Sequence, residues 1–246
     1  MGGTTEASLL ARALVDAGES AVFSYAGRTA NPVAQPLPTR VGGFGGVSGL
    51  RAYLRSNGIS HVVDATHPFA AGMTRNAIDA CTAEGIALVG YERTPWHAGP
   101  GDRWTSVPDV KAAVDALPQA PTRVFLAIGK QQLEVFAAKP QHHYVLRLVD
   151  PPMGLPLPDA LAVVARGPFT VDGDLALLRH HAISHIVAKN AGGSGAAAKL
   201  QAARQLAVPV ILIDRPVVPA RAVVDTVAGV LDWLHHGTNA GTERGV

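Results

Sequence analysis

The 246-residue sequence lacks several features that define common protein classes. Its single cysteine, Cys81, cannot form an internal disulfide or a C-x-x-C motif, so we expect a reducing compartment and no structural zinc. No apolar run reaches about 18 residues and no basic-then-apolar signal segment opens the chain, which predicts a cytoplasmic protein without a membrane span. The formal net charge of only +2 gives no indication of nucleic-acid binding.

Motifs of several enzyme and metal-site classes are also missing. The sequence has no H-E-x-x-H helix, no G-x-S-x-G elbow and no G-x-x-x-x-G-K-[ST] loop. The histidine pairs at 142–143, 180–181 and 235–236 lack metal-ligand spacing, so no metal site is predicted. Aromatic residues make up only 5% of the chain, whereas hydrophobic residues make up 48%. This bias is typical of parallel α/β proteins with Val- and Ile-rich strands between Ala-rich helices.

Short β-branched runs alternate with amphipathic segments, and this alternation predicts βαβ units with parallel sheets. The expected strands are 21–25, 61–64, 86–89, 124–128, 144–149, 161–165, 185–188 and 209–213, with a further candidate at 104–107. The expected helices are 5–17, 48–57, 71–84, 110–117, 133–137, 172–182, 194–206 and 221–236. Five prolines between residues 93 and 122 indicate a boundary in that stretch. We therefore predict two Rossmann-like lobes, 1–108 and 109–246.

The chain opens with a glycine turn that leads into a predicted helix. Gly2, Thr4 and Ala7 have the offsets of the G-x-G-x-x-G/A dinucleotide fingerprint, with Thr in place of the second Gly. Such a turn lets backbone N–H groups at a helix N-terminus face a pyrophosphate, and Gly3 and Thr5 complete the candidate cradle. A Gly-rich strand–helix turn without a ligand remains an equal alternative.

A second segment concerns the choice between the two nicotinamide dinucleotides. Ala26-Gly27-Arg28 follows the expected strand 21–25, near the position where NAD-binding proteins carry an acidic residue for the ribose. An arginine suits a 2′-phosphate, because its guanidinium can bind phosphate oxygens as a fork. Ser24 could add a hydroxyl, whereas the alternative role for Arg28 is a solvated surface charge. Together the two segments favour NADPH.

Two further loops of the first lobe carry candidate ligand contacts. Four glycines in residues 42–46 suggest a close backbone approach at Gly43, Phe44 and Gly45, or else a mobile surface loop. The loop after strand 61–64 holds Thr66, His67 and Phe69 at a carboxyl strand end, where open α/β sheets bind ligands. We predict that these residues contact the cofactor, although a single histidine is often structural.

The second lobe places cations and backbone amides at successive strand ends, which is a suitable arrangement for binding carboxylates. For each single cation the alternative is a solvated charge. The candidate substrate-binding residues are Lys130, Gln131, Lys189, Asn190, Gly192, Gly193, Lys199 and Arg215.

Taken in order, these segments resemble the precorrin-6A reductase family of cobalamin biosynthesis. The shared segments are GGTTEA at 2–7, AGR at 26–28, RVGGFGG at 40–46, DATHPFA at 64–70, RGPF at 166–169, KNAGG at 189–193 and IDRP at 213–216. The resemblance spans residue 2 to about residue 235. It implies two Rossmann-like lobes with the active site in the cleft between them, and NADPH-dependent reduction of precorrin-6A to precorrin-6B. It further implies a tetrapyrrole substrate with many carboxylates, which allows hand-over of the product to other pathway enzymes. For the proton, our own candidates are His67 and Lys130, with bulk water as the alternative.

Three features depart from the family pattern. Lys130 stands where many relatives have Arg, and Ala191 stands where Ser is usual. Relatives also have an apolar strand before the glycine turn, whereas here Met1 directly precedes Gly2. We expect an alternative start, a truncated chain or another strand in that place. Two alternatives remain open: the cobalt-precorrin-6A reductase of the cobalt-early pathway, and a dinucleotide-binding sensor without catalysis.

Overall fold

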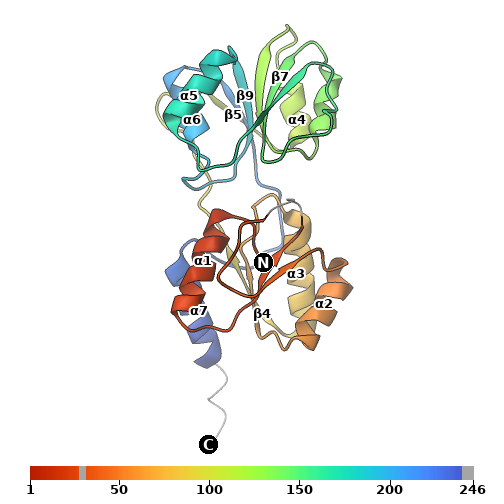
Figure 1. Cartoon of the computed structure of the whole chain (residues 1–246), viewed down its shortest axis with the longest axis vertical. Coiled ribbons are helices and arrows are strands. Elements are labelled where there is room, and N and C mark those ends of the chain that lie inside the picture. Colours follow the sequence, from red (N-terminus) through yellow and green to blue (C-terminus); the bar gives the residue numbers. More distant parts are fainter. Residues whose placement is uncertain (28–31, 240–246) are drawn as a thin grey trace, which may run out of the picture. The chain divides into compact units, whose positions relative to one another are not determined.

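The structure is a computed structural model that describes residues 1–27 and 32–239. It is a mixed α/β protein, and every strand pairing in the described residues is parallel. The chain separates into two compact units (Figure 1). Unit 1 comprises residues 1–94 and 217–246, and unit 2 comprises residues 95–216. The α/β class and the parallel sheets predicted from the sequence are confirmed.

Unit 1 contains two short parallel sheets, ordered β2-β1 and β3-β4-β11. Helices α1 and α7 lie on one side of its strands and α2 and α3 on the other (Figure 1). Its elements are α1 (Thr5–Asp16), β1 (Phe23–Tyr25), β2 (Thr39–Val41), α2 (Gly46–Ser56), β3 (His61–Asp64), α3 (Ala71–Glu84), β4 (Ala87–Tyr91), β11 (Ala222–Val224) and α7 (Val227–Asn239).

The helices of unit 1 form where the sequence supplies caps and apolar faces. Thr4 caps α1, and its side chain accepts the N–H of Ala7. Leu10 and Leu14 of α1 are buried four residues apart, as an amphipathic helix requires. On the other side of the strands, Cys81 is 1% exposed in the cluster between α2, α3 and β3, which confirms it as a core residue.

Met1 and Gly2 lie between β1 and β3 and connect the two sheets of unit 1. The amino group of Met1 donates to the Val63 carbonyl (2.8 Å), and the Ala65 N–H donates to the Met1 carbonyl (3.0 Å). On the other side, the Gly2 N–H donates to the Ser24 carbonyl (3.0 Å). Burial lowers the pKa of the Met1 amino group. A cavity of about 330 Å³ extends from Met1 between α1 and α2. In the part of the chain that the structure describes, no other strand lies between β1 and β3.

Unit 2 is a single six-stranded parallel sheet in the order β5-β10-β9-β6-β7-β8. Helices α5 and α6 pack together on one side, and α4 packs with the 3₁₀ helix η1 on the other (Figure 1). Its elements are β5 (Trp104–Val107), α4 (Val110–Asp115), β6 (Arg123–Ala127), η1 (Leu133–Ala138), β7 (His143–Leu148), β8 (Ala160–Val164), α5 (Val171–His180), β9 (His185–Lys189), α6 (Ala198–Gln205) and β10 (Val210–Ile213).

The central strands of unit 2 are buried on both faces, which explains their nearly continuous apolar sequences. Phe125 and Ile186 are 0% exposed, and Leu212 is 1% exposed. One ion pair lies inside this core, between Arg147 on β7 and Asp174 on α5. The Arg147 guanidinium also lies 4.0 Å from the ring centroid of Phe169, so the pair fixes the loop that follows β8.

The division of the chain differs from the predicted lobes 1–108 and 109–246 at two places. Strand β5 lies before residue 108 but pairs with β10 in unit 2. The chain returns to unit 1 after residue 216, where β11 pairs with β4. The segment 221–236, expected to be one helix, therefore contains β11 before α7 begins. Strand β2 was not predicted, and the helix expected at 194–206 is shortened to α6 at its start.

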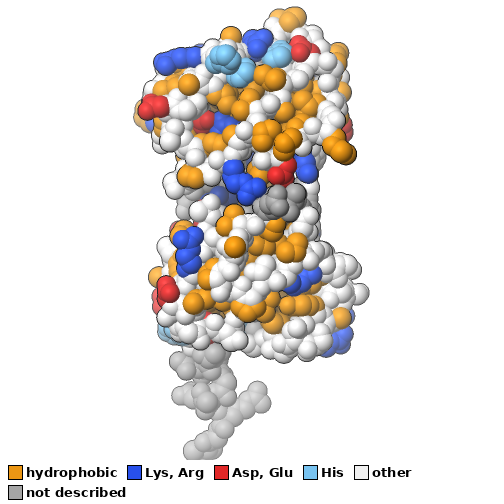
Figure 2. All heavy atoms as spheres, viewed as in Figure 1, with side chains coloured by type: hydrophobic (Ala, Val, Ile, Leu, Met, Phe, Trp, Pro, Cys, Tyr) orange, Lys and Arg blue, Asp and Glu red, His pale blue; other side chains and the backbone are white. Residues whose placement is uncertain are grey.

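Apolar side chains are spread over the visible face of both units, with cations and anions scattered between them (Figure 2). Within residues 1–27 and 32–239, none of the helices has the length and apolar character needed to span a membrane. The same residues contain no group of three or more His, Cys, Asp or Glu side chains that could hold a metal ion.

Candidate functional site

In each unit most of the predicted site residues lie in loops at the carboxyl ends of parallel strands, the edge where open α/β sheets bind ligands. In unit 1, residues 42–45 follow β2 and residues 65–70 follow β3. In unit 2, residues 129–132, 190–197 and 214–215 follow β6, β9 and β10. Each unit therefore carries its own set of candidate contacts.

The glycine turn of unit 1 requires both of its glycines. A Cβ on Gly2 would lie 2.3 Å from the ring of Phe23 and 2.9 Å from Cβ of Ala7, so only glycine fits there. Gly3 has a φ of 128°, and a Cβ at this position would meet no atom within 4 Å. The backbone of Gly3 thus borders open space at the start of α1, which is the property that a phosphate cradle needs. Thr5 is exposed in the first turn of α1.

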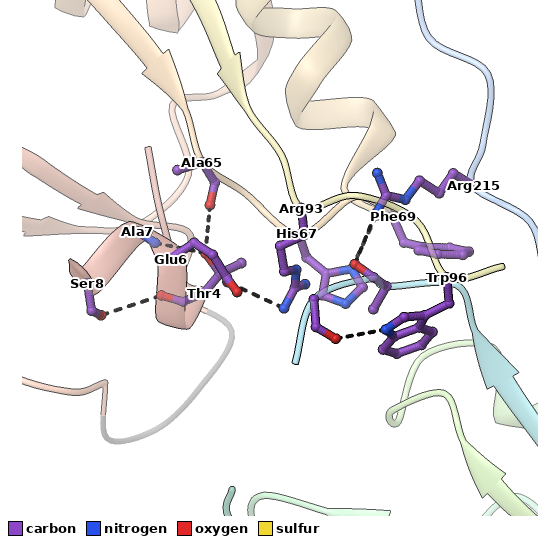
Figure 3. Close-up of polar contacts among 12 residues, drawn as sticks. Thr4, Glu6, Ala7, Ser8, Ala65, His67, Phe69, Arg93, Trp96 and Arg215 are labelled. Carbon is purple, nitrogen blue, oxygen red and sulfur yellow. Dashed lines mark hydrogen bonds and ion pairs between the residues drawn. The ribbon is translucent and has the colours of Figure 1, made fainter. Parts of the chain in front are cut away.

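Thr4 connects this turn to the loop after β3 (Figure 3). Its hydroxyl accepts the Ala7 N–H (3.1 Å) and donates to the Ala65 carbonyl (3.0 Å). Thr4 stands where the dinucleotide fingerprint has a second glycine, and its side chain holds the turn against the neighbouring loop. The two loops predicted to contact the cofactor are therefore one hydrogen-bonded arrangement.

An acidic side chain lies in the first turn of α1, where a bound pyrophosphate would be repelled by an isolated negative charge. Glu6 Oε2 is 3.4 Å from Nη1 of Arg93, which follows β4, and both side chains are largely buried (Figure 3). This ion pair balances the charge of Glu6 beside the glycine turn. The carboxylate is thus compatible with an anion in the turn.

The loop after β3 is held by a buried carboxylate. Asp64, 2% exposed, accepts the hydroxyl of Thr66 (2.7 Å), the N–H of Thr66 (3.2 Å) and the hydroxyl of Thr74 (2.7 Å). Thr66 therefore helps to shape the loop. His67 is exposed, and its Nδ1 accepts the N–H of Phe69 (3.2 Å). This bond places the proton of a neutral His67 on Nε2, so the ring can donate a hydrogen bond.

The loop after β2 is held by Arg40, which sequence reasoning did not select. Arg40 donates to the Ser24 hydroxyl (2.8 Å) and to the carbonyls of Gly42 (2.9 Å) and Gly43 (3.1 Å). Its guanidinium lies 3.9 Å from the ring centroid of Phe44. Gly45, with a φ of 79°, is the N-cap of α2. Arg28, the predicted contact for a 2′-phosphate, lies outside the described residues.

The loop after β9 in unit 2 is fixed by Trp96, from the segment that enters this unit. Asn190 Oδ1 accepts the backbone N–H of Trp96 (2.8 Å), and Asn190 Nδ2 donates to its carbonyl (3.0 Å). The Trp96 indole N–H donates to the Gly193 carbonyl (2.7 Å; Figure 3). Gly192 and Gly193 have φ values of 70° and 71°. The Asn190 side chain is 8% exposed, and its hydrogen bonds position this loop.

Three predicted cations of unit 2 border the loop after β9: Lys189 ends β9, Lys199 lies in α6 and Arg215 follows β10. Arg215 donates from Nε to the Asn190 carbonyl (3.1 Å) and from Nη2 to the Ala191 carbonyl (3.1 Å). Lys199 is 7% exposed; its Nζ donates to the Ala196 carbonyl (2.5 Å) and lies 4.9 Å from the Trp96 ring centroid. Burial lowers the pKa of Lys189.

Two other predicted residues, Lys130 and Gln131, are exposed in the loop between β6 and η1. Beside the loop after β9, unit 2 also has a cavity of about 380 Å³. Trp96, Asn190 and Arg215 line this cavity, together with Asp214. The structure therefore brings Asn190, Gly192, Gly193, Lys199 and Arg215 into one loop region, whereas Lys130 and Gln131 lie in another.

Sequence reasoning missed Arg40, Arg93 and Trp96. Arg40 belongs to the RVGGFGG segment, so its place beside the glycine loop was a visible signal. Arg93 and Trp96 lie in the proline-rich segment that was interpreted as a boundary, and their partners are distant in sequence. No local pattern indicates such contacts.

Comparison with known proteins gives one consistent result. The family model described as "Precorrin-6x reductase CbiJ/CobK" matches residues 1–235. The chain is 68% identical to a precorrin-6A reductase of Rhodobacter capsulatus, with 100% of this chain and 98% of that protein covered. It is 44% identical to a precorrin-6A reductase of Rhodococcus erythropolis, with 95% of both chains covered. A cobalt-precorrin-6A reductase of Priestia megaterium is 29% identical over 76% of this chain and 78% of its own.

A solved structure described as "CobK precorrin-6A reductase" has the same fold. It superposes with a TM-score of 0.93 at 67% sequence identity, covering 100% of this chain and 97% of the other.

Proposed function

Because the chain belongs to the precorrin-6x reductase CbiJ/CobK family of oxidoreductases, we propose that it reduces one double bond of precorrin-6A with NADPH, giving precorrin-6B. The observation that supports this most strongly is 68% identity to a precorrin-6A reductase along the full length of the chain. The reaction adds a hydride to one ring carbon and a proton to its neighbour.

The residues of unit 1 fit a nicotinamide dinucleotide. The backbone of Gly3 borders open space at the N-terminus of α1, where Thr4 and Thr5 can direct N–H groups at a pyrophosphate. The ion pair between Glu6 and Arg93 offsets the one acidic charge of this turn. The further contacts that we assign to the cofactor are Ser24, Arg28, Gly43, Phe44, Gly45, Thr66, His67 and Phe69.

When bound, NADPH supplies the hydride, while the chain supplies binding, orientation and the environment of the proton. His67, with its proton on Nε2, can hold a ligand oxygen by a hydrogen bond. Lys130 is exposed in the loop after β6, and its ammonium group has only N–H donors, so it is the second candidate for proton delivery to the reduced ring. Bulk water would serve the same purpose.

Unit 2 supplies the contacts that we assign to the tetrapyrrole carboxylates. Lys189 ends β9, and the loop after it carries the amides of Gly192 and Gly193, in a shape held by Asn190 and Arg215. Cations and backbone amides at a strand end are a suitable site for carboxylates. Gln131 and Lys199 complete the set, and the Lys199 ammonium lies 4.9 Å from the Trp96 ring centroid.

The metal-free substrate is favoured over the cobalt-containing one. The relatives named precorrin-6A reductase are 41–68% identical to this chain, whereas those named cobalt-precorrin-6A reductase are 26–29% identical. Mixing the protein with NADPH and precorrin-6A should give a steady fall in absorbance at 340 nm and stoichiometric precorrin-6B. Faster turnover of cobalt-precorrin-6A would reverse the substrate assignment. Dinucleotide binding without oxidation of either mixture would leave only the sensor alternative.

A second experiment tests the roles of the two units. Lys189→Ala should raise the Michaelis constant for precorrin-6A about tenfold or more, because a charge-assisted contact to a carboxylate is lost. Its dissociation constant for NADPH should stay unchanged. Lys111→Ala is the matched control, since Lys111 is an exposed lysine of unit 2 paired with Asp115 on α4. Loss of NADPH binding in Lys189→Ala would show that the two ligands are assigned to the wrong units.

A further inference from the structure

The end of strand β1 differs from that of an NAD-binding site. In such sites an acidic residue about 20 residues after the glycine turn binds the ribose 2′-hydroxyl. Here the corresponding strand is β1, and the Ser24 carbonyl accepts the N–H of Gly2 from the glycine turn. Ser24 is 9% exposed, and residues 23–27 include no acidic side chain. The ribose end of the predicted cofactor site thus lacks the charge that would select NADH.

A cation from the neighbouring strand occupies this place instead. Nη1 of Arg40, on β2, donates to the Ser24 hydroxyl at 2.8 Å. The pairing of β1 with β2 places Arg40 directly opposite Ser24, so the contact follows from the register of the sheet. One face of the guanidinium rests on the Phe44 ring at 3.9 Å, which fixes its plane.

Arg40 retains capacity for an anion after its contacts within the protein. A guanidinium carries five N–H donors, and three bonds go to Ser24, Gly42 and Gly43. Two N–H groups are therefore without a partner in the described residues. Since the side chain is only partly buried, these groups can reach a ligand.

We propose that Arg40 is a specificity-determining residue that binds the 2′-phosphate of NADPH, with Ser24 as its positioning partner. This inference rests on the proposed function, because it presupposes a nicotinamide dinucleotide at the glycine turn. It adds a cation from β2 to Arg28, which the sequence predicts as the 2′-phosphate contact, and it gives a role to the arginine that opens the RVGGFGG segment. A purely structural role, in which Arg40 only holds the loop of residues 42–45, makes a different prediction.

The test compares dissociation constants for NADPH and NADH, measured by fluorescence titration of the full-length protein. Arg40→Gln should weaken the binding of NADPH about ten- to a hundredfold, the range expected for a lost charge-assisted hydrogen bond to phosphate. The dissociation constant for NADH should change less than about threefold. Arg40→Lys should recover part of the affinity, because it restores the charge without the fork. Arg55→Gln is the matched control, since Arg55 is a more exposed arginine of unit 1 paired with Glu84.

Each other outcome has a definite meaning. If Arg40→Gln loses affinity for NADPH and NADH equally, Arg40 only holds the loop and the inference is overturned. The inference is also overturned if Arg40→Gln keeps the preference of the wild type for NADPH. A wild-type protein that binds both dinucleotides equally would overturn the proposed NADPH dependence as well. If Arg40→Gln does not fold, Arg40→Lys decides, because the inference requires it to lose NADPH affinity selectively. Competition by 2′,5′-ADP against ADP gives the same comparison without the nicotinamide.

Discussion

The hydroxyl of Thr4 provides a quantitative test of how the glycine turn is held. Replacing Thr4 with Val keeps the shape of the side chain but removes both of its hydrogen bonds. Loss of the N-cap bond to Ala7 costs about 1 kcal/mol, and loss of the bond to the Ala65 carbonyl costs about 1 kcal/mol more. The free energy of unfolding should therefore fall by about 2 kcal/mol in urea titrations, whereas Thr4→Ser should stay within about 0.5 kcal/mol of the wild type.

Thr170 offers a matched control for this prediction. It also caps a helix, α5 of unit 2, but the only bond in which its hydroxyl takes part among the described residues is the one from the Gly173 N–H. Thr170→Val should cost about 1 kcal/mol and leave dinucleotide affinity unchanged. Thr4→Val should weaken the binding of NADPH and NADH alike, because the whole glycine turn loses its contact with the loop after β3. Equal unfolding free energies for the two Val variants, with unaltered NADPH binding in both, would refute this account of the turn.

Three further predictions concern unit 2. Trp96→Phe removes the hydrogen bond to the Gly193 carbonyl but keeps an aromatic ring at this position. The Michaelis constant for precorrin-6A should therefore rise severalfold while the affinity for NADPH stays constant, and a change in both would contradict the positioning role. Burial, and then the nearby charge of Lys139, lowers the pKa of His142 in the folded protein. The unfolded state therefore binds this proton more readily, and the free energy of unfolding falls as the pH drops below about 6.5. His142→Leu should reduce that fall by up to about 1.4 kcal/mol per pH unit, measured by urea titrations at pH 7.5 and 5.5. Asp174→Leu should lower the free energy of unfolding by about 3–5 kcal/mol, because it leaves Arg147 buried and unpaired. Adding Arg147→Met should restore much of this loss, whereas additive losses in the double variant would be inconsistent with a buried pair.

The sequence predicted the parts of the fold that depend on local patterns. Alternating apolar runs located nearly all the longer strands, because a strand buried on both faces must be apolar along its length. Strands β2 and β11, each of three residues, were missed: β2 has no apolar run, and β11 lies within the segment interpreted as the last helix. The return of the chain to unit 1 was also missed. It depends on the pairing of β11 with β4, more than 130 residues earlier, and no local pattern indicates it.

The loops that carry the candidate site residues could be located from the sequence, but the contacts that hold those loops could not. Glycines and cations at strand ends identified the loops, because the geometry of parallel sheets gathers these ends at one edge. The side chains that hold those loops were not evident: Trp96 acts through its backbone and indole N–H, and Arg93 through a glutamate on another element. Asn190 and Lys199, chosen as substrate contacts, have their polar groups bonded to the backbone of unit 2 itself.

A crystal structure of the protein with NADP⁺ tests the central claim most directly. The account predicts pyrophosphate oxygens within about 2.7–3.2 Å of backbone N–H groups in the Gly3–Thr5 turn, and the 2′-phosphate beside Arg40. A dinucleotide bound at the strand ends of unit 2, with the turn at Gly3 facing only solvent, would contradict it.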